Sequence, residues 1–138
     1  MEESSTKPAV RRRKYSSIKV LVADTDLDVH QLVRDILEIN FRDVQIERAL
    51  SGSSFLSKIN EAEEQFDLIL YNNRIDEEQN EPVLAQVKDR NPEIANRIVI
   101  IAESEEDVKR SIYESMPYIT RPFSLDNFGE VVQRTCAP

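Results

Sequence analysis

Apolar, strand-like runs alternate with amphipathic segments along most of this chain. The strand-like runs cover residues 18–24, 44–49, 66–71, 97–102 and 118–120. The run at 97–102 is almost continuously apolar, which is typical of a strand that is buried on both faces of a sheet. Because parallel strands are joined by crossovers that are usually helices, the alternation predicts a parallel sheet with helices on both faces.

The first amphipathic segment shows the helical period clearly. Its apolar residues at three- and four-residue spacing are Val29, Leu32, Val33, Ile36 and Leu37. This spacing predicts a helix over about residues 27–40, with Asp26 as its N-cap. His30, the single histidine, is expected at the edge of the apolar face, exposed to solvent.

Turn and capping residues place the remaining helices. We predict them after Ser51, Pro82, Ser104 and Ser124, with a polar loop over residues 72–80. The predicted fold class is therefore α/β, a flavodoxin-like (βα)5 domain with a doubly wound parallel five-stranded sheet in strand order 2-1-3-4-5.

Length and composition limit the protein class. A chain of 138 residues suits one domain, and 40% hydrophobic residues exclude a mostly disordered chain. No apolar run approaches the roughly 18–20 residues needed to cross a bilayer. Cys136 is the single cysteine and can form no internal disulfide, and the N-terminus lacks the apolar core of a signal peptide. We therefore expect a cytoplasmic protein.

Charge divides the chain into a basic arm, residues 1–17, and an acidic domain, residues 18–138. The charged residues of the arm are Glu2, Glu3, Lys7, Arg11, Arg12, Arg13 and Lys14. The arm thus carries +3, which leaves −11 for the domain in a chain whose total is −8. An acidic domain disfavours nonspecific binding to nucleic acid or anionic membrane. We expect the arm to be disordered; the alternative is an anion-binding arm, which salt-sensitive binding and deletion of the arm would reveal.

Polar residues stand where the strand-like runs end. Asp24 closes the first run and is followed by Thr25 and Asp26, while Asn72 follows the third run. The segment 49–56 has an alanine, polar, glycine and apolar pattern, and residues 118–123 read Tyr-Ile-Thr-Arg-Pro-Phe. In their order and spacing, over about residues 18–136, these motifs resemble the receiver domains of response regulators.

Receiver domains take a phosphoryl group onto an aspartate beside a bound Mg²⁺, and the resemblance implies how this chain departs from them. Asp24 keeps the first acid of the family's acidic pair, but Thr25 stands at the second, and Asp26 is expected to point elsewhere as a helix cap. Asn72 replaces the acceptor aspartate. An amide is not a nucleophile toward phosphate and brings no charge to a metal, so Mg²⁺ binding is expected to be weak or absent.

Three further positions depart from the family pattern. Ala102 stands where receivers have a threonine or serine, Glu103 adds bulk and negative charge beside it, and Arg121 replaces a lysine. The resemblance therefore implies a pseudo-receiver, with no catalytic residues and a degenerate phosphoacceptor pocket made of Asp24, Thr25, Asn72, Ala102 and Arg121. We expect Asp24 and Arg121 to form an ion pair.

The expected function is a phosphorylation-independent signalling and protein-interaction module of two-component type, neither an enzyme nor a binder of small-molecule substrates. In receivers the output face lies between the fourth and fifth helices, which here gives Val108, Ile112, Tyr113 and Tyr118. Protein partners of a signalling pathway, or a homodimer through this face, are expected there; core packing is the competing explanation for Ile112 and Tyr113. Two further hypotheses for the function are an atypical receiver that is phosphorylated at Asp24 or Asp26, and a protein that binds anions through its basic arm.

Overall fold

Five parallel strands form the centre of the computed structural model, in the order β2-β1-β3-β4-β5. The structure describes residues 15–62, 64–79, 81–109, 115–121, 127–128, 130–131 and 135. The strands are β1 (Tyr15–Ala23), β2 (Phe41–Ala49), β3 (Leu68–Asn72), β4 (Ile98–Ala102) and β5 (Tyr118–Thr120). This topology confirms the predicted flavodoxin-like fold class.

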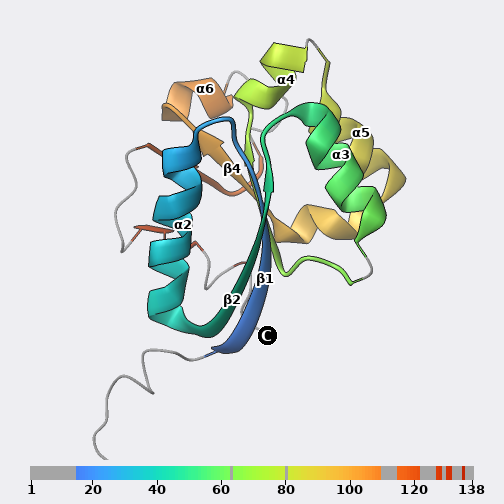
Figure 1. Ribbon diagram of the computed structural model, residues 1–138. Coiled ribbons are helices and arrows are strands. Elements are labelled where there is room, and N and C mark those ends of the chain that lie inside the picture. Colours follow the sequence, from blue (N-terminus) through green and yellow to red (C-terminus); the bar gives the residue numbers. More distant parts are fainter. Residues whose placement is uncertain are drawn as a thin grey trace, which may run out of the picture.

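Helices cover both faces of the sheet. They are α2 (Leu27–Asn40), α3 (Gly52–Glu61), α4 (Arg74–Gln79), α5 (Val83–Arg90) and α6 (Glu105–Lys109), together with the 3₁₀ helix η1 (Pro92–Arg97). Figure 1 shows α2 on one side of the sheet and α3 and α5 on the other, with α4 and α6 near its upper edge. The described residues of the last segment, among them Phe128 and Val131, are also helical.

The alternating strand residues build one hydrophobic cluster on each face. Leu21, Ile69 and Ile100 belong to the cluster beneath α3 and α5. Val22, Leu70 and Ile101 belong to the cluster beneath α2, which Phe128 also joins. All of β3 and β4 is buried, which explains why their sequences are almost continuously apolar rather than alternating.

Local capping residues fix where the helices begin. Asp26 caps α2 by accepting a hydrogen bond from the backbone N–H of Asp28, at 2.9 Å. Ser51 does the same for α3 through the N–H of Ser54, at 3.1 Å. Each cap satisfies a backbone donor that the helix itself leaves unpaired. These two caps place the first turns of α2 and α3 directly after the ends of β1 and β2.

Several predicted elements differ in extent from the observed ones. β1 begins at Tyr15 and β2 at Phe41, so three residues of the predicted arm belong to a strand. The predicted loop over residues 72–80 contains the short helix α4. Leu32, which the periodicity assigns to the apolar face of the first helix, is 39% exposed. The periodicity of apolar residues could not detect α4, because that helix has a single buried apolar residue, Ile75.

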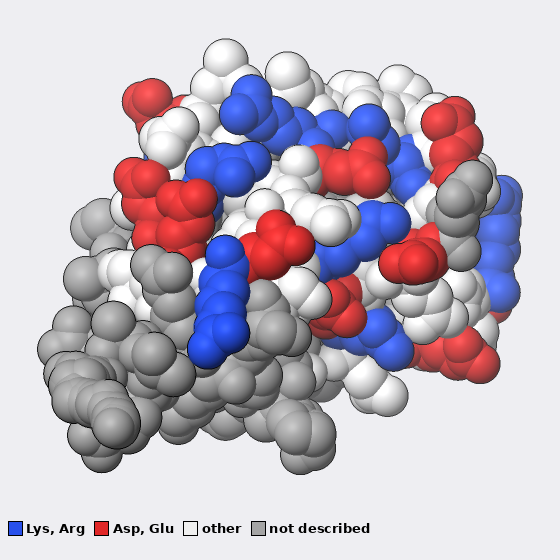
Figure 2. Space-filling model, turned by 60° about the horizontal axis from the view of Figure 1, so that its bottom comes forward, with Lys and Arg blue, Asp and Glu red and all other residues white. Residues whose placement is uncertain are grey.

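The remaining residues of the predicted arm, 1–14, lie outside the described residues, as does Cys136. None of the described helices is long and apolar enough to cross a membrane. Figure 2 shows the lower face of the domain, where basic side chains adjoin one another along the top of the view and acidic side chains lie beside and below them.

Candidate functional site

The carboxyl ends of the strands bring the predicted pocket residues to one edge of the sheet, the upper edge in Figure 1. Asp24 follows β1, Asn72 ends β3, Ala102 ends β4 and Arg121 follows β5. In open α/β sheets the crevice at this edge, where the strand order reverses, is the usual place for a ligand site. The edge is therefore the candidate functional site.

A hydrogen-bond network joins Asp24 to Asn72. The Asn72 Nδ2 group donates to Asp24 Oδ2 at 3.0 Å, while its Oδ1 atom accepts from the backbone N–H of Arg74 at 2.9 Å. The other carboxylate oxygen of Asp24 accepts from the backbone N–H of Asp26 at 2.8 Å. Asp24 is 1% exposed and Asn72 is 3% exposed. The amide thus supplies a donor to a buried carboxylate, where a second carboxylate would repel it.

His30 is buried beneath this network, not exposed as predicted. It is 2% exposed, and its Nε2 atom lies 2.8 Å from the backbone oxygen of Asp24. Because a carbonyl only accepts, Nε2 carries a hydrogen. The Nδ1 atom has no hydrogen-bond partner among the described residues. The helical wheel places His30 at the edge of the apolar face, and only the packing of α2 against the end of β1 shows that this edge is covered.

Arg121 forms ion pairs with two carboxylates at the mouth of the site. It donates from Nη2 to Asp26 at 2.7 Å and from Nη1 to Glu103 at 3.3 Å. Partial burial acts to lower the pKa of Arg121, but the hydrogen bond with Asp26 and the charge of Glu103 outweigh it and raise that pKa. The same hydrogen bond, followed by the cap bond from Asp28, lowers the pKa of Asp26.

These pairings correct the prediction of an ion pair between Asp24 and Arg121. The guanidinium contacts Asp26, which was expected to point away, and Asp24 is bonded by Asn72 instead. Asp26 therefore has two roles, because one oxygen caps α2 and the other binds Arg121. Glu103, expected to be unfavourable beside an incoming phosphate, contributes the second carboxylate to the guanidinium.

The remaining pocket residues add little polar chemistry. Thr25 is exposed, and Ala102 is 0% exposed, so its methyl group is part of the core. In the described part of the chain, no group of three or more His, Cys, Asp or Glu side chains has the arrangement of a metal site. The oxygens of Asp24 and Asn72 that would serve a cation each accept a hydrogen bond from the protein itself.

Tyr118, assigned to the interaction face, is half-buried and bonded to α6. Burial and a hydrogen bond to the Glu105 carboxylate raise the pKa of the Tyr118 hydroxyl. The pKa of Glu105 is lowered by its hydrogen bond with Lys109 and then by the one with Tyr118. The Tyr118 side chain is therefore tied to the first turn of α6.

Only part of the predicted interaction face can be placed. Val108 is 1% exposed, so it belongs to the core and does not offer a docking surface. It lies on α6, whose contacts with β4 turn this residue inward. Ile112 and Tyr113 lie outside the described residues. Of the predicted face, Tyr118 is the described residue that remains accessible in part.

Sequence reasoning missed the roles of Glu105 and His30. Glu105 lies in a run of acidic residues that gave no reason to single it out. Its link to Tyr118 depends on the pairing of β4 with β5, which places Ile100 beside Tyr118. No local pattern in either segment carries that information.

No protein-family model matches the sequence. No curated protein matches it either. Similarity appears instead among solved structures.

Receiver domains are prominent among those structures. A response-regulator receiver domain protein from Clostridium thermocellum has a TM-score of 0.65 at 17% identity, over 86% of this chain and 94% of that chain. NtrX from Brucella abortus, crystallised with ADP, has a TM-score of 0.69 at 24% identity, over 87% of this chain and 26% of that one. CheY4 of Vibrio cholerae, a chemotaxis protein, has a TM-score of 0.64 at 19% identity, over 87% and 99%. The fold is thus that of receiver domains.

Proposed function

We propose that this domain is a receiver-like signalling module, of two-component type, that binds protein partners without being phosphorylated. It is not an enzyme in this proposal, and Mg²⁺ binds weakly or not at all. The observation that carries the proposal is the hydrogen bond from the Asn72 amide to Asp24 Oδ2, at 3.0 Å between buried groups. An amide at this place leaves the buried edge without the second carboxylate that phosphoryl transfer and a divalent cation both need.

The pairing of Arg121 supports the same proposal. Its guanidinium is held by Asp26 and Glu103, two carboxylates supplied by the protein itself. An incoming phosphate would have to displace these contacts and would then lie beside the Glu103 charge. Like charges at close range repel each other, which disfavours phosphate at this position. The positive charge of Arg121 is already balanced by the two carboxylates of the protein. The domain would then be held in one conformation or be switched by a partner.

The test compares wild type with Asn72→Asp. Each purified protein is treated with Mg²⁺ and acetyl phosphate for intact mass, and with Mg²⁺ and beryllofluoride for amide NMR spectra. We expect neither an adduct nor shifts around residue 72 in wild type. A phosphorylated wild-type protein would overturn the proposal and would make its acceptor, with Asp24 and Asp26 as first candidates, the next question.

Thermal unfolding of Asn72→Asp and of wild type, with and without Mg²⁺, is a second test of the proposal. Asn72→Asp removes the donor to Asp24 and buries a second carboxylate, which we expect to cost about 1–3 kcal/mol. Added Mg²⁺ should restore part of this loss in the variant, because a ligand that binds only the folded state stabilises it. It should leave wild type unchanged.

Asn73→Asp is the matched control, since it makes the same charge change one residue along the chain, also at a buried position. Its unfolding should not become dependent on Mg²⁺. Stabilisation of wild type by Mg²⁺ to the same degree as Asn72→Asp would contradict the proposal.

A further inference from the structure

Two side-chain bridges connect β5 to the start of α6. The first joins Arg121, which follows β5, to Glu103, which follows β4, at 3.3 Å between Nη1 and Oε2. The second is a hydrogen bond between the side chains of Tyr118, the first residue of β5, and Glu105, the first residue of α6. The two carboxylates lie on either side of Ser104, whose hydroxyl caps the first turn of α6.

The backbone places the first bridge directly beyond the paired ends of β4 and β5. Ala102 pairs with Thr120, and the N–H of Arg121 donates to the oxygen of Ala102 at 3.0 Å. Glu103 and Arg121 are therefore the next residues after two neighbouring strand ends. Val108, near the other end of α6, is buried and packs toward β4. The short helix is thus held at its beginning by side-chain bridges and near its end by apolar packing.

Arg121 extends the connection to α2. Its Nη2 atom donates to Asp26 at 2.7 Å, so one guanidinium joins the first turn of α2 to the residue after β4. Asp26 is itself held in place, because its other oxygen accepts the cap bond from Asp28. A guanidinium is a rigid fork of donors and can bind two carboxylates at once, which the single ammonium of a lysine does less well.

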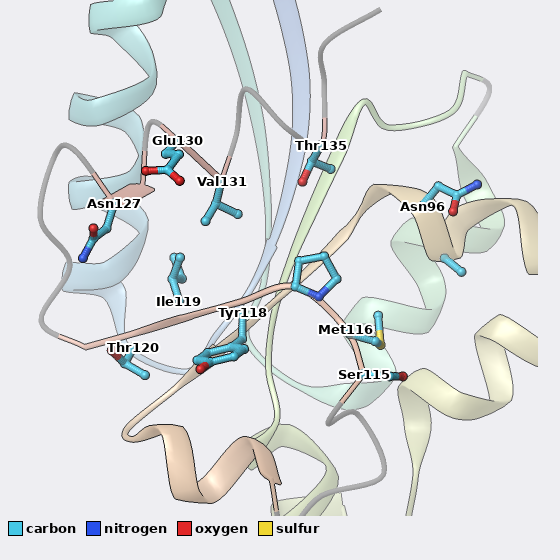
Figure 3. A pocket seen from close by; sticks show the side chains of 12 residues that line it. Asn96, Ser115, Met116, Tyr118, Ile119, Thr120, Asn127, Glu130, Val131 and Thr135 are labelled. Atoms are coloured by element: carbon cyan, nitrogen blue, oxygen red, sulfur yellow. The ribbon is translucent and has the colours of Figure 1, made fainter.

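Tyr118 also borders a cavity of about 680 Å³ that lies beside β5. Figure 3 shows the Tyr118 ring on one side of β5, with Ile119 and Val131 on the other. Ile119 belongs to the cluster beneath α2, while Tyr118 packs against the cluster beneath α3 and α5. Because the half-buried ring packs on the core with one part and borders the cavity with another, the hydroxyl bond to Glu105 sets the direction of the ring.

We infer that the two bridges form a lock that keeps the start of α6, residues 103–109, in one position. The inference rests on the proposed function, because it decides that such a module is held in one conformation rather than switched. One bridge between partly exposed groups contributes little by itself. Two bridges that act on the same short helix combine, since the helix can leave its position only when both are broken.

Two variants each remove one bridge with little change in shape. Glu103→Gln keeps the length of the side chain but removes its charge, and Tyr118→Phe keeps the ring but removes the hydroxyl. Glu47→Gln is the matched control, because Glu47 on β2 binds Lys58 on α3 at 3.0 Å and is exposed to a similar degree. That bridge also joins a strand to a helix, at the opposite edge of the sheet from β5.

The experiment records ¹⁵N relaxation dispersion, which detects motion between microseconds and milliseconds, on the full chain without Mg²⁺. Dispersion at residues 103–109 should be weak in wild type. Glu103→Gln and Tyr118→Phe should each raise the population of a second position about two- to fivefold, as expected for contacts between partly exposed groups. The double variant should raise it by roughly the product of the two factors. Glu47→Gln should leave it unchanged.

The lock is tested most sharply at the bridge that a variant does not touch. Glu103→Gln should raise dispersion at Glu105 and Tyr118, and Tyr118→Phe should raise it at the Nε group of Arg121. The inference is overturned if each variant changes only the residues that it contacts, if neither variant changes the dispersion, or if wild type already exchanges between two well-populated positions.

Circular dichroism establishes that the variants are folded, and Glu103→Gln, a change at an exposed side chain, carries the test if Tyr118→Phe is not. Loss of the lock would leave the proposed function untouched, because that proposal depends on phosphoryl and Mg²⁺ uptake around Asn72. Such uptake by wild type would refute the proposed function and would not alter these spectra, which are recorded without Mg²⁺.

Discussion

Asp26 has two roles that one substitution can separate. One of its oxygens accepts the cap bond from Asp28, and the other binds Arg121. Asparagine is as good an N-cap as aspartate but carries no charge. Asp26→Asn should therefore keep α2 capped while it removes the ion pair.

The pH dependence of stability is the measurement for this variant. In the folded protein, the hydrogen bond with Arg121 holds the pKa of Asp26 below its ordinary value of 3.8. A lowered pKa stabilises the fold above the unfolded value, and this contribution is lost as the pH falls through the folded pKa. In urea titrations from about pH 6 to pH 3, wild type should thus lose more stability than Asp26→Asn.

Asp43→Asn provides the control, because Asp43 is exposed and makes no side-chain ion pair among the described residues. Its acid curve should follow that of wild type. If Asp26→Asn and wild type lost stability in parallel below about pH 5, the ion pair with Arg121 would contribute nothing in solution.

Among the helices and strands, the caps that follow the strands decide where helices start. Ser51 is the clearest case, because its hydroxyl accepts from the Ser54 N–H, whereas the exposed Ser53 hydroxyl lies 3.2 Å from the Ser51 hydroxyl and caps no backbone group among the described residues. We expect Ser51→Ala to lower the free energy of unfolding by about 1 kcal/mol. Ser53→Ala should stay within about 0.5 kcal/mol of wild type, as exposed substitutions do. Equal losses in chemical denaturation would argue against capping by Ser51.

Side-chain contacts between helices and strands also hold the region of the candidate site together. His30 ties α2 to the end of β1, and Tyr118 ties β5 to α6 through Glu105. The first contact joins a helix to a strand end at the candidate site, and the second joins the first residue of β5 to the first turn of α6, which follows β4. The edge is therefore held by side-chain bonds between elements as well as by the backbone ladder.

Across the domain, two hydrophobic clusters share one sheet. Leu21 belongs to the cluster beneath α3 and α5, and Leu70 to the cluster beneath α2. Because the same strands bear both, we expect the domain to unfold in a single transition. Leu21→Ala and Leu70→Ala should each cost about 2–5 kcal/mol and shift that one transition.

Far-UV circular dichroism and tyrosine fluorescence check this expectation, the latter being usable because the chain has no tryptophan. The midpoints from both probes should coincide in wild type and in both variants. Separate transitions, each sensitive to only one of the two substitutions, would mean that the faces unfold independently.

Local sequence patterns were enough to predict the fold and the position of the candidate site. Strand periodicity is local, so the apolar runs ending near Asp24, Asn72, Ala102 and Thr120 could be recognised from neighbouring residues alone. The carboxyl ends of parallel strands meet at one edge, which is why strand-end residues could be grouped without coordinates. The short helix α4 and the 3₁₀ helix η1 were elements that this reasoning missed.

The pairing of side chains, in contrast, emerged only from tertiary packing. Arg121 and Asp26 are 95 positions apart, and the choice of Asp26 and Glu103 over Asp24 depends on where β5 lies relative to the first turn of α2. The burial of His30 and the cavity beside β5 likewise depend on how elements pack. Periodicity tells which face of an element is covered. The hydrogen-bond partner of a polar atom, however, depends on differences of a few tenths of an ångström in the distances between atoms of elements that are far apart in the sequence.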